Sequence, residues 1–346
     1  MTDEAKGDGT NRSDAATNQD PWTVLRLLSW TTDFFRQRGS DSPRLDAEVL
    51  LAHSLGCSRI ELYTAFGSEP SGPQRQTFRE LVRRRGEGAP VAYLVGHREF
   101  YSLRFSVTPA VLIPRPETEH LVTLALDHAK SLAPAGSTRT TSSTAEKPSP
   151  EKPVPDNAVA QCPPATPSLR PLKIADVGTG SGAIAVALAK HLPAVYPGGC
   201  LITAIDLSPD ALDVARGNAR DHGVDPQIEF VQGDLLDKLP AGSDFDMILS
   251  NPPYVSRAEY DDLDPTVRDH EPKMALLAGQ RGTEIIARLI DQAASRLRPG
   301  GLLAIELSPM IAKDCAVLVA GNGHFHEPKI IRDLGGNQRI VTAIRH

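Results

Sequence analysis

The residues Asn251-Pro252-Pro253-Tyr254 combine groups that can hold a planar NH₂ group. They follow the apolar run 245–249, which predicts a buried strand. Two consecutive prolines fix φ and carry no N–H donors, so the backbone carbonyls can be held rigidly toward a ligand. The side-chain oxygen of Asn251 and the carbonyl of Pro252 can each accept one hydrogen bond, and Tyr254 offers an aromatic face for stacking.

An NH₂ group held in this way is suited to methyl transfer when it belongs to an amide. An amide nitrogen is a poor nucleophile because its lone pair is conjugated with the carbonyl. Two acceptors on its hydrogens would orient the lone pair toward a sulfonium methyl and stabilise the positive charge that develops. No strong general base is needed, because the proton becomes acidic only as the methyl arrives. The alternative is a rigid loop without chemistry.

A glycine-rich segment predicts where a cofactor would bind. Residues 176–182 read Asp-Val-Gly-Thr-Gly-Ser-Gly, directly after an apolar strand and at the start of a helix. Glycines let the backbone turn sharply and approach a ligand that sits near a helix N-terminus. The spacing is GxGxG and not the GxGxxG of the dinucleotide fingerprint, which favours a cofactor without a pyrophosphate. The candidate cofactor residues are Gly178, Thr179, Gly180, Ser181 and Gly182.

Two acids follow the next two predicted strands. Asp206 ends the second strand, where a carboxylate can accept hydrogen bonds from both ribose hydroxyls of a nucleoside. Asp234 and Leu235 follow the third strand, where the carboxylate or the nearby backbone can meet an adenine amino group. Either acid could instead cap the next element, and Asp206 stands just before Ser208-Pro209.

The elements that must position these residues alternate between strands and helices over residues 171–346. Such alternation predicts an α/β domain with a mostly parallel sheet and helices on both faces. The last stretch, at 329–331 and 340–344 around Gly335-Gly336-Asn337, predicts an antiparallel hairpin on the sheet edge.

The part of the chain before this domain has a different pattern. Residues 21–95 carry apolar side chains at helical spacing and predict a small helical bundle that holds a partner. Its arginines Arg79, Arg83, Arg84 and Arg85 form either a contact strip or a solvated helix face. Residues 96–130 predict a β-hairpin, with its strands broken at Thr108-Pro109, and a connecting helix.

Two segments lack the apolar side chains that a core needs. Residues 131–170 are rich in Pro, Ser, Thr and Ala, and we expect a disordered insert to which we assign no function. Residues 1–20 carry five acids and fit neither a secretory nor a transit peptide, so we expect a disordered tail. This favours a cytoplasmic location, with a mitochondrial one as the alternative.

Composition narrows the classes of function. The chain has 346 residues, a net charge of −6 and four cysteines. An acidic protein is a poor candidate for direct, sequence-specific nucleic-acid binding, which usually needs a basic face. The cysteines form no CxxC pair, so we expect no metal site and a reducing compartment. No run approaches the ~20 apolar residues that a membrane span needs.

At these residues the chain resembles the release factor glutamine methyltransferases, the HemK/PrmC family. The resemblance covers nearly the whole chain from Trp22, apart from the insert. The matching blocks are residues 93–100, 112–119, 176–182, 251–254 and 271–276. Asn-Pro-Pro-Tyr is shared with N6-adenine methyltransferases acting on nucleic acid, whereas the Ile-Pro-Arg-Pro-Glu-Thr-Glu block after a helical domain is more specific. The implied fold is a Rossmann-like class I methyltransferase domain with a seven-stranded sheet.

The resemblance implies an activity and a role for each site residue. The activity is methyl transfer from S-adenosylmethionine to the glutamine amide in the Gly-Gly-Gln motif of class I peptide chain release factors. By position, the glycine-rich segment lines the cofactor, Asp206 holds its ribose, and Asp234 with Leu235 borders adenine, next to Asn251. The residues that bind the glutamine are Asn251, Pro252, Pro253 and Tyr254, with Asn251, Pro252 and Tyr254 as the catalytic set. Phe100, Arg115 and Glu117 are expected near the cleft.

The sequence departs from the family pattern in two places. Leu235 stands where an aromatic residue is frequent, and Leu307-Ser308-Pro309-Met310 replaces a segment with a glycine and a glutamine. Two alternative functions stay open: an N6-adenine methyltransferase acting on nucleic acid, and an inactive module that binds a release factor. We expect a monomer whose helical domain and hairpin help to grip the release factor.

Overall fold

The computed structural model describes residues 21–134, 169–240 and 244–346. They form two compact units that divide between Glu87 and Gly88, whereas the sequence placed the end of the helical domain at residue 95. The tail at 1–20 and nearly all of the insert at 131–170 lie outside the described residues. In the described part of the chain, no helix is both long and apolar enough to cross a membrane.

The first unit is a bundle of helices held by a small apolar core. Its described helices are α1 Val24–Gln37, α2 Pro43–Leu55, α3 Arg59–Thr64 and α4 Gly72–Gly86. Helix α2 begins at Pro43 and ends at Gly56 in the left-handed conformation, as the sequence predicts. The side chains of Thr23, Ser58 and Ser71 cap the N-termini of α1, α3 and α4.

A groove of about 720 Å³ lies on this unit, between residues of α1 and α4. The ring of Trp30 stacks on Phe34 with a centroid separation of 5.4 Å and remains half exposed. The second tryptophan, Trp22, also lines the groove. Arginines Arg75, Arg79 and Arg83 lie along the α4 side. We call this surface the Trp–Arg groove.

The second unit begins with α5 Val91–Val95 and the expected hairpin, which is formed by β1 His97–Phe100 and β2 Leu103–Ser106. The sequence placed the break between the two strands at Thr108-Pro109, and this position is wrong. The turn is Tyr101-Ser102, and both residues have positive φ, at 51° and 59°. Two positive φ angles suit the tight two-residue turn that matches strand twist, although neither residue is glycine. The backbone N–H of Tyr101 donates to the Glu119 carboxylate at 2.8 Å, which supports this turn.

The remaining elements build the α/β domain. After η1 Pro116–Thr118, its helices are α6 Glu119–Leu132, α7 Ala183–Val195, α8 Pro209–Asp221, η2 Asp225–Gln227, α9 Arg257–Asp261, α10 Pro265–Arg268, α11 Lys273–Leu276, α12 Glu284–Arg296 and α13 Ala312–Gly321. Its strands are β3 Leu172–Val177, β4 Cys200–Asp206, β5 Ile228–Gln232, β6 Phe245–Ser250, β7 Val255–Ser256, β8 Leu277–Gly279, β9 Leu297–Glu306, β10 Lys329–Arg332 and β11 Gln338–Ile344.

The central sheet has seven strands in the order β10-β11-β9-β6-β3-β4-β5. Strands β3, β4, β5, β6 and β9 run parallel, and the β10–β11 hairpin adds antiparallel strands at one edge. The strand order reverses between β3 and β6, because β4 and β5 extend one way and β6 and β9 the other. Ligands of open α/β sheets bind at such a switch point, beyond the carboxyl ends of the strands.

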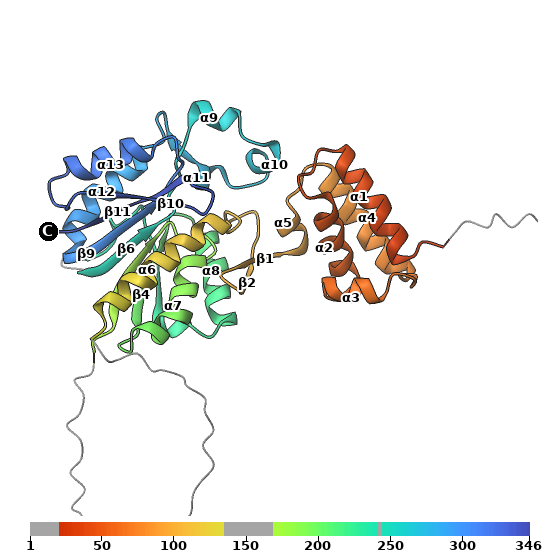
Figure 1. Ribbon diagram of the computed structural model, residues 1–346, viewed down its shortest axis with the longest axis horizontal. Coiled ribbons are helices and arrows are strands. Elements are labelled where there is room, and N and C mark those ends of the chain that lie inside the picture. Colours follow the sequence, from red (N-terminus) through yellow and green to blue (C-terminus); the bar gives the residue numbers. More distant parts are fainter. Residues whose placement is uncertain (1–20, 135–168, 241–243) are drawn as a thin grey trace, which may run out of the picture. The chain divides into compact units, whose positions relative to one another are not determined.

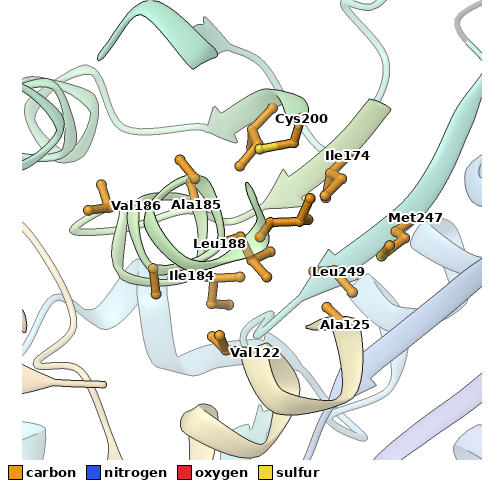
Figure 2. Close-up of a cluster of buried hydrophobic side chains, with 14 of the residues drawn as sticks. Val122, Ala125, Ile174, Ile184, Ala185, Val186, Leu188, Cys200, Met247 and Leu249 are labelled. Atoms are coloured by element: carbon orange, nitrogen blue, oxygen red, sulfur yellow. The ribbon is translucent and has the colours of Figure 1, made fainter. Parts of the chain in front are cut away.

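Two apolar cores cover the two faces of the sheet. On one face α6 and α7 pack on β3 and β6, and Figure 2 shows Val122, Ala125 and Leu188 facing the same cluster. On the other face α12 and α13 pack against alternate residues of the same strands. Figure 1 shows the sheet between these helix layers. Alternation of this kind follows from the two-residue period of a strand, with Ile174 and Ala175 in different cores.

Asn218 of α8 fixes the hairpin to the α/β domain. Its carboxamide oxygen accepts from the backbone N–H of Ser106 at 2.8 Å, and its nitrogen donates to the Ser106 carbonyl at 3.0 Å. The same nitrogen donates to the Ser181 carbonyl in the glycine-rich segment at 2.8 Å. The Asn218 side chain is fully buried, so these bonds satisfy its own polar atoms and the buried carbonyl of Ser181.

Candidate active site

Four neighbouring strands end in register and place the candidate site residues in one row. Val177 of β3 pairs with Ile205 of β4 and with Ser250 of β6, and Ser250 pairs with Ile305 of β9. The residues that follow these four paired positions are Gly178, Asp206, Asn251 and Glu306. The first three are candidate site residues, and the fourth is an acid. Parallel pairing therefore brings together residues that are far apart in the sequence.

A cavity of about 280 Å³ opens at this row, close to the lower end of the range for small-molecule sites. Its lining is mostly apolar, with a few polar groups. Of the candidate cofactor residues, only Gly182 is absent from this lining. Those that line the cavity are Gly178, Thr179, Gly180, Ser181, Asp206, Asp234, Leu235 and Asn251. The cavity thus lies where the sequence predicts the cofactor.

The glycine-rich segment is held in a fixed turn at the end of β3. The N–H groups of Gly178 and Thr179 both donate to the Ile205 carbonyl, at 2.8 and 2.9 Å. Gly178, Gly180 and Gly182 all have positive φ. A Cβ on Gly182 would lie 3.1 Å from the Cβ of Ala215, so glycine is required there for close packing of the turn on α8. Gly182 therefore shapes the turn from behind the cavity wall.

Asp176 supports this turn from below. Its Oδ2 accepts from the Thr179 hydroxyl at 2.7 Å and from the Ala185 N–H at 3.1 Å. The side chain is completely buried, and burial raises the pKa of this carboxyl to about 7, an effect that those two hydrogen bonds only partly offset. The sequence included Asp176 in the glycine-rich segment without assigning it this supporting position.

Asp206 joins β4 to the glycine-rich segment. Its Oδ2 accepts from the Gly180 N–H at 2.8 Å and its Oδ1 from the Ser208 N–H at 2.9 Å. Burial raises the pKa of the carboxyl, against the lowering effect of these bonds. The cap of α8 is Ser208, whose hydroxyl accepts from the Ala211 N–H, so Asp206 does not take the capping role. Each Asp206 oxygen keeps a lone pair for a ligand.

Asp234 and Leu235 form the part of the wall beyond β5. The Asp234 carboxylate accepts from the Arg288 guanidinium at 2.7 Å, and both side chains are about half exposed. Leu235 has a positive φ of 56°, which is uncommon for a residue with a branched side chain. This residue lines the cavity.

Asn251 is oriented by two side chains from other segments. Its Nδ2 donates to the Thr118 hydroxyl oxygen at 3.0 Å and to Oε1 of Glu306 at 3.1 Å. Within the described ranges no hydrogen bond occupies Oδ1 of Asn251. Burial raises the pKa of Glu306 to about 7, and a hydrogen bond from Thr118 lowers it in part. The carboxamide therefore has its nitrogen fixed in the protein and its oxygen available.

The other residues of the Asn-Pro-Pro-Tyr loop are placed differently from one another. Pro253 lines the cavity, whereas Pro252 is buried and lies outside the lining. Tyr254 also lies outside the lining and packs against the core that includes residues of α12, and burial raises the pKa of its phenol to about 12. The Ser250 hydroxyl donates to the Val177 carbonyl at 2.7 Å, which binds the start of this loop to β3.

The far wall of the cavity comes from residues 110–118 and 272–277. The buried carboxylate of Glu271 accepts from the Ile113 N–H and from the Arg115 guanidinium, which links the two segments. Strand β7 directly follows Tyr254 and pairs with β8, so residues 272–277 are also tied to the Asn-Pro-Pro-Tyr loop. Arg115 therefore lines the cavity as part of an ion pair.

Of the other cleft candidates, Phe100 and Glu117 do not line the cavity. Phe100 is buried in the core and packs edge-on against Phe105. Glu117 lies close enough to Glu306 for its charge to raise the pKa of that carboxyl. Sequence reasoning did not select Thr118, Glu306 or Asn218. Glu306 carried a signal, because an acid that ends an apolar parallel strand lies at the ligand edge of the sheet.

Comparison with known proteins places both units in described families. Residues 26–96 match a family described as the PrmC N-terminal domain, and residues 170–324 match a methyltransferase domain family. The chain is 50% identical to a release factor glutamine methyltransferase of Rhodopirellula baltica, over 94% of this chain and 97% of that protein. It is 41% identical to a protein of the same name from Chlorobaculum tepidum, over 93% and 97% of the two chains.

The raised pKa of Asp176 predicts a pH dependence of stability. The native state holds this proton between pH about 4 and about 7, where the unfolded state has lost it. The free energy of unfolding therefore falls as the pH rises through this window. Asp176→Asn cannot ionise, so its stability relative to the native sequence should rise by on the order of 3 kcal/mol between pH 5 and pH 8.

Urea denaturation at the two pH values measures this difference. Asp213→Asn, a substitution of an exposed acid on α8, serves as the control and should leave the pH dependence unchanged. Equal pH dependence in Asp176→Asn and the native sequence would show that Asp176 is ionised in the folded protein at pH 5.

Proposed function

The chain belongs to the release factor glutamine methyltransferases, and we propose that the cavity and the Asn251 loop carry out the reaction for which this family is named. The enzyme transfers a methyl group from S-adenosylmethionine to a glutamine of a peptide chain release factor. The acceptor is the side-chain amide nitrogen, in the Gly-Gly-Gln motif of class I factors. The observation that carries the assignment to this site is the free Oδ1 of Asn251 at the edge of the cavity.

The cavity residues fit S-adenosylmethionine. When bound, this cofactor supplies an electrophilic methyl group on a sulfonium sulfur. The remaining lone pairs of Asp206 suit the two ribose hydroxyls, since each oxygen accepts one backbone N–H and can accept another bond. Asp234 and Leu235 would border adenine, and the positive φ angles of the glycine-rich segment let its backbone lie along the ligand.

Asn251 and Pro252 would hold the glutamine amide. The Asn251 Oδ1 accepts one amide hydrogen and the Pro252 carbonyl accepts the other, which turns the nitrogen lone pair toward the methyl group. Both acceptors also stabilise the positive charge that develops on this nitrogen. The amide nitrogen loses its proton only after positive charge has developed on it, so the site needs no strong general base. Tyr254 would stack against the amide plane.

The alternatives from the sequence are less well supported. A nucleic-acid adenine methyltransferase would share Asn251 to Tyr254, but residues 26–96 match the N-terminal domain family of the release factor enzymes. An inactive binding module would not need a complete cavity. Here the glycine-rich segment, Asp206 and Asn251 all meet at one cavity.

We also propose that the Trp–Arg groove binds an acidic segment of the release factor. Trp30 is half exposed and offers an apolar anchor, and Arg75 and Arg79 lie beside it. Tryptophan and arginine are the residues that contribute most to protein interfaces. Among the described residues, the groove lining carries three arginines and no acid. Arg83 pairs with Glu80 and Glu87, so an acidic partner would be complementary to Arg75 and Arg79.

We propose that the enzyme acts as a monomer in the cytoplasm. The cavity and its Asn251 loop are lined by residues of a single unit of one chain, so no second copy is needed to complete them. The release factor substrate works on ribosomes, and the relatives come from bacteria.

Transfer of radiolabel from S-adenosylmethionine to a purified release factor tests the function. The label should enter the native factor and should be lost when the glutamine of its Gly-Gly-Gln motif is replaced by alanine. Labelling that persists in the substituted factor would contradict the proposed acceptor. Labelling of adenine in DNA or RNA would support the nucleic-acid alternative instead.

Substitutions of Asn251 and Asp206 should separate turnover from cofactor binding. Asn251→Ala removes a substrate acceptor and should lower kcat on the order of 100-fold with little change in cofactor Kd. Asp206→Ala removes the ribose acceptors and should raise that Kd on the order of 10- to 100-fold. Calorimetry and initial rates measure the two quantities, with Asp213→Ala as an exposed control. Equal loss of cofactor binding in Asn251→Ala would show that Asn251 belongs to the cofactor wall.

Charge reversal tests the Trp–Arg groove. The double variant Arg75→Glu/Arg79→Glu should raise KM for the release factor at least roughly tenfold with kcat unchanged, because rim charges act on encounter. Arg36→Glu, on α1 but outside the groove, is the control. An unchanged KM would contradict the proposal. If the double variant alone, without release factor, changed its retention volume in gel filtration, the groove would instead bind a second copy of the chain.

A further inference from the structure

Three side chains from separate segments form a polar cluster beside the cavity. Thr118 ends η1, Asn251 follows β6 and Glu306 ends β9. The Asn251 Nδ2 donates to both Thr118 Oγ1 and Glu306 Oε1, at 3.0 and 3.1 Å. Thr118 and Glu306 are only 5% and 3% exposed, so water cannot replace these partners. We call this set the Thr118–Asn251–Glu306 cluster.

This geometry decides which end of the Asn251 carboxamide faces the substrate. A carboxamide can turn by 180° about its last side-chain bond, which exchanges a hydrogen-bond acceptor for a donor. In its ionised form, which prevails above its pKa of about 7, Glu306 only accepts hydrogen bonds, so Oε1 pairs with the nitrogen and not with the oxygen of Asn251. Thr118 acts in the same sense, because its hydroxyl oxygen accepts from the Asn251 nitrogen at 3.0 Å.

The wrong orientation would block the chemistry. With Nδ2 toward the cleft, two NH₂ groups would face each other and the substrate amide would lose one of its acceptors. A reaction that depends on two acceptors would then lose both alignment and stabilisation of charge. Two buried acceptors, Thr118 Oγ1 and Glu306 Oε1, would also lose their donor, which makes that orientation costly in free energy.

From these contacts we infer that Thr118 and Glu306 are positioning residues that hold the Asn251 carboxamide with its oxygen toward the substrate amide. The inference rests on the proposed function of Asn251. Neither residue needs to touch the substrate, since each acts through Asn251. Charged groups near Glu306 include Glu117, Arg115 and Arg339. Arg115 pairs with Glu271, and Arg339 pairs with Asp333.

Thr118→Val and Glu306→Gln test the inference. Thr118→Val keeps the shape and removes the acceptor. Glu306→Gln keeps the length but can present a donor as readily as an acceptor. Each should lower kcat about tenfold, the scale of one hydrogen bond, and leave the Kd of S-adenosylmethionine within twofold. Thr118→Ser, which retains the hydroxyl, should recover most of the turnover lost in Thr118→Val.

A double-mutant cycle separates positioning from a general structural effect. In an Asn251→Ala background, Thr118→Val and Glu306→Gln should cause no further loss of kcat, because the side chain through which they act is missing. A tenfold loss that persists in that background would overturn the inference. Two matched controls are Thr123→Val, an exposed threonine on α6, and Glu229→Gln, an exposed glutamate on β5, and both should retain full activity.

A measurement without activity keeps this test independent of the proposed function. In ¹⁵N-labelled protein, the side-chain signal that disappears in Asn251→Ala identifies the Nδ2 group. Its hydrogens should exchange slowly with solvent in the native protein and about tenfold faster in Thr118→Val. Fast exchange in the native protein would overturn the inference. Failure of methyl transfer to any release factor, with slow exchange intact, would count against the proposed function alone.

Discussion

The parallel register of four central strands is the constraint on which the site depends. Val177, Ile205, Ser250 and Ile305 lie side by side in the sheet. The next residue of each strand is therefore presented at the same edge, and these residues are the ones that hold ligand or support those that do. A shift of one residue in any of these pairings would turn the following side chain to the other face of the sheet. The sheet thus sets the relative positions of the active-site residues, and the loops that follow the strands supply the chemical groups.

Buried polar groups then convert this row into a rigid site. Asp176 and Asp206 fix the glycine-rich segment, Glu271 fixes Arg115 and the far wall, and Glu306 with Thr118 fixes Asn251. Each of these carboxylates loses hydration on burial, so it must be compensated by hydrogen bonds from the protein. These hydrogen bonds restrict the conformations of the side chains that make them. The polar groups of the site therefore need little reorganisation when the reaction occurs. Such preorganisation is the main way in which a site without a strong base can accelerate methyl transfer.

The sequence predicted the parts of this arrangement that have local signals. Apolar periodicity indicated the alternating strands and helices, and glycine spacing and strand ends identified the cavity residues. It did not identify the Tyr101-Ser102 turn, because neither residue is one of the usual left-handed residues. It also did not pair Asn251 with Thr118 or Glu306, since these residues are separated by 133 and 55 positions in the chain. Contacts of that kind follow from strand order and register, which local patterns do not encode.

The position of the long segment between Leu132 and Leu172 has a practical consequence. Helix α6 ends at Leu132, and β3 begins at Leu172 and runs toward the cavity, so Leu172 lies at the end of the strand opposite to the site. Added chain at that end changes neither the register of β3 nor the loop that follows Val177. The join is therefore a natural place for attaching a foreign domain, a dye or a surface anchor, where an immobilised enzyme would keep its cleft open to a large protein substrate.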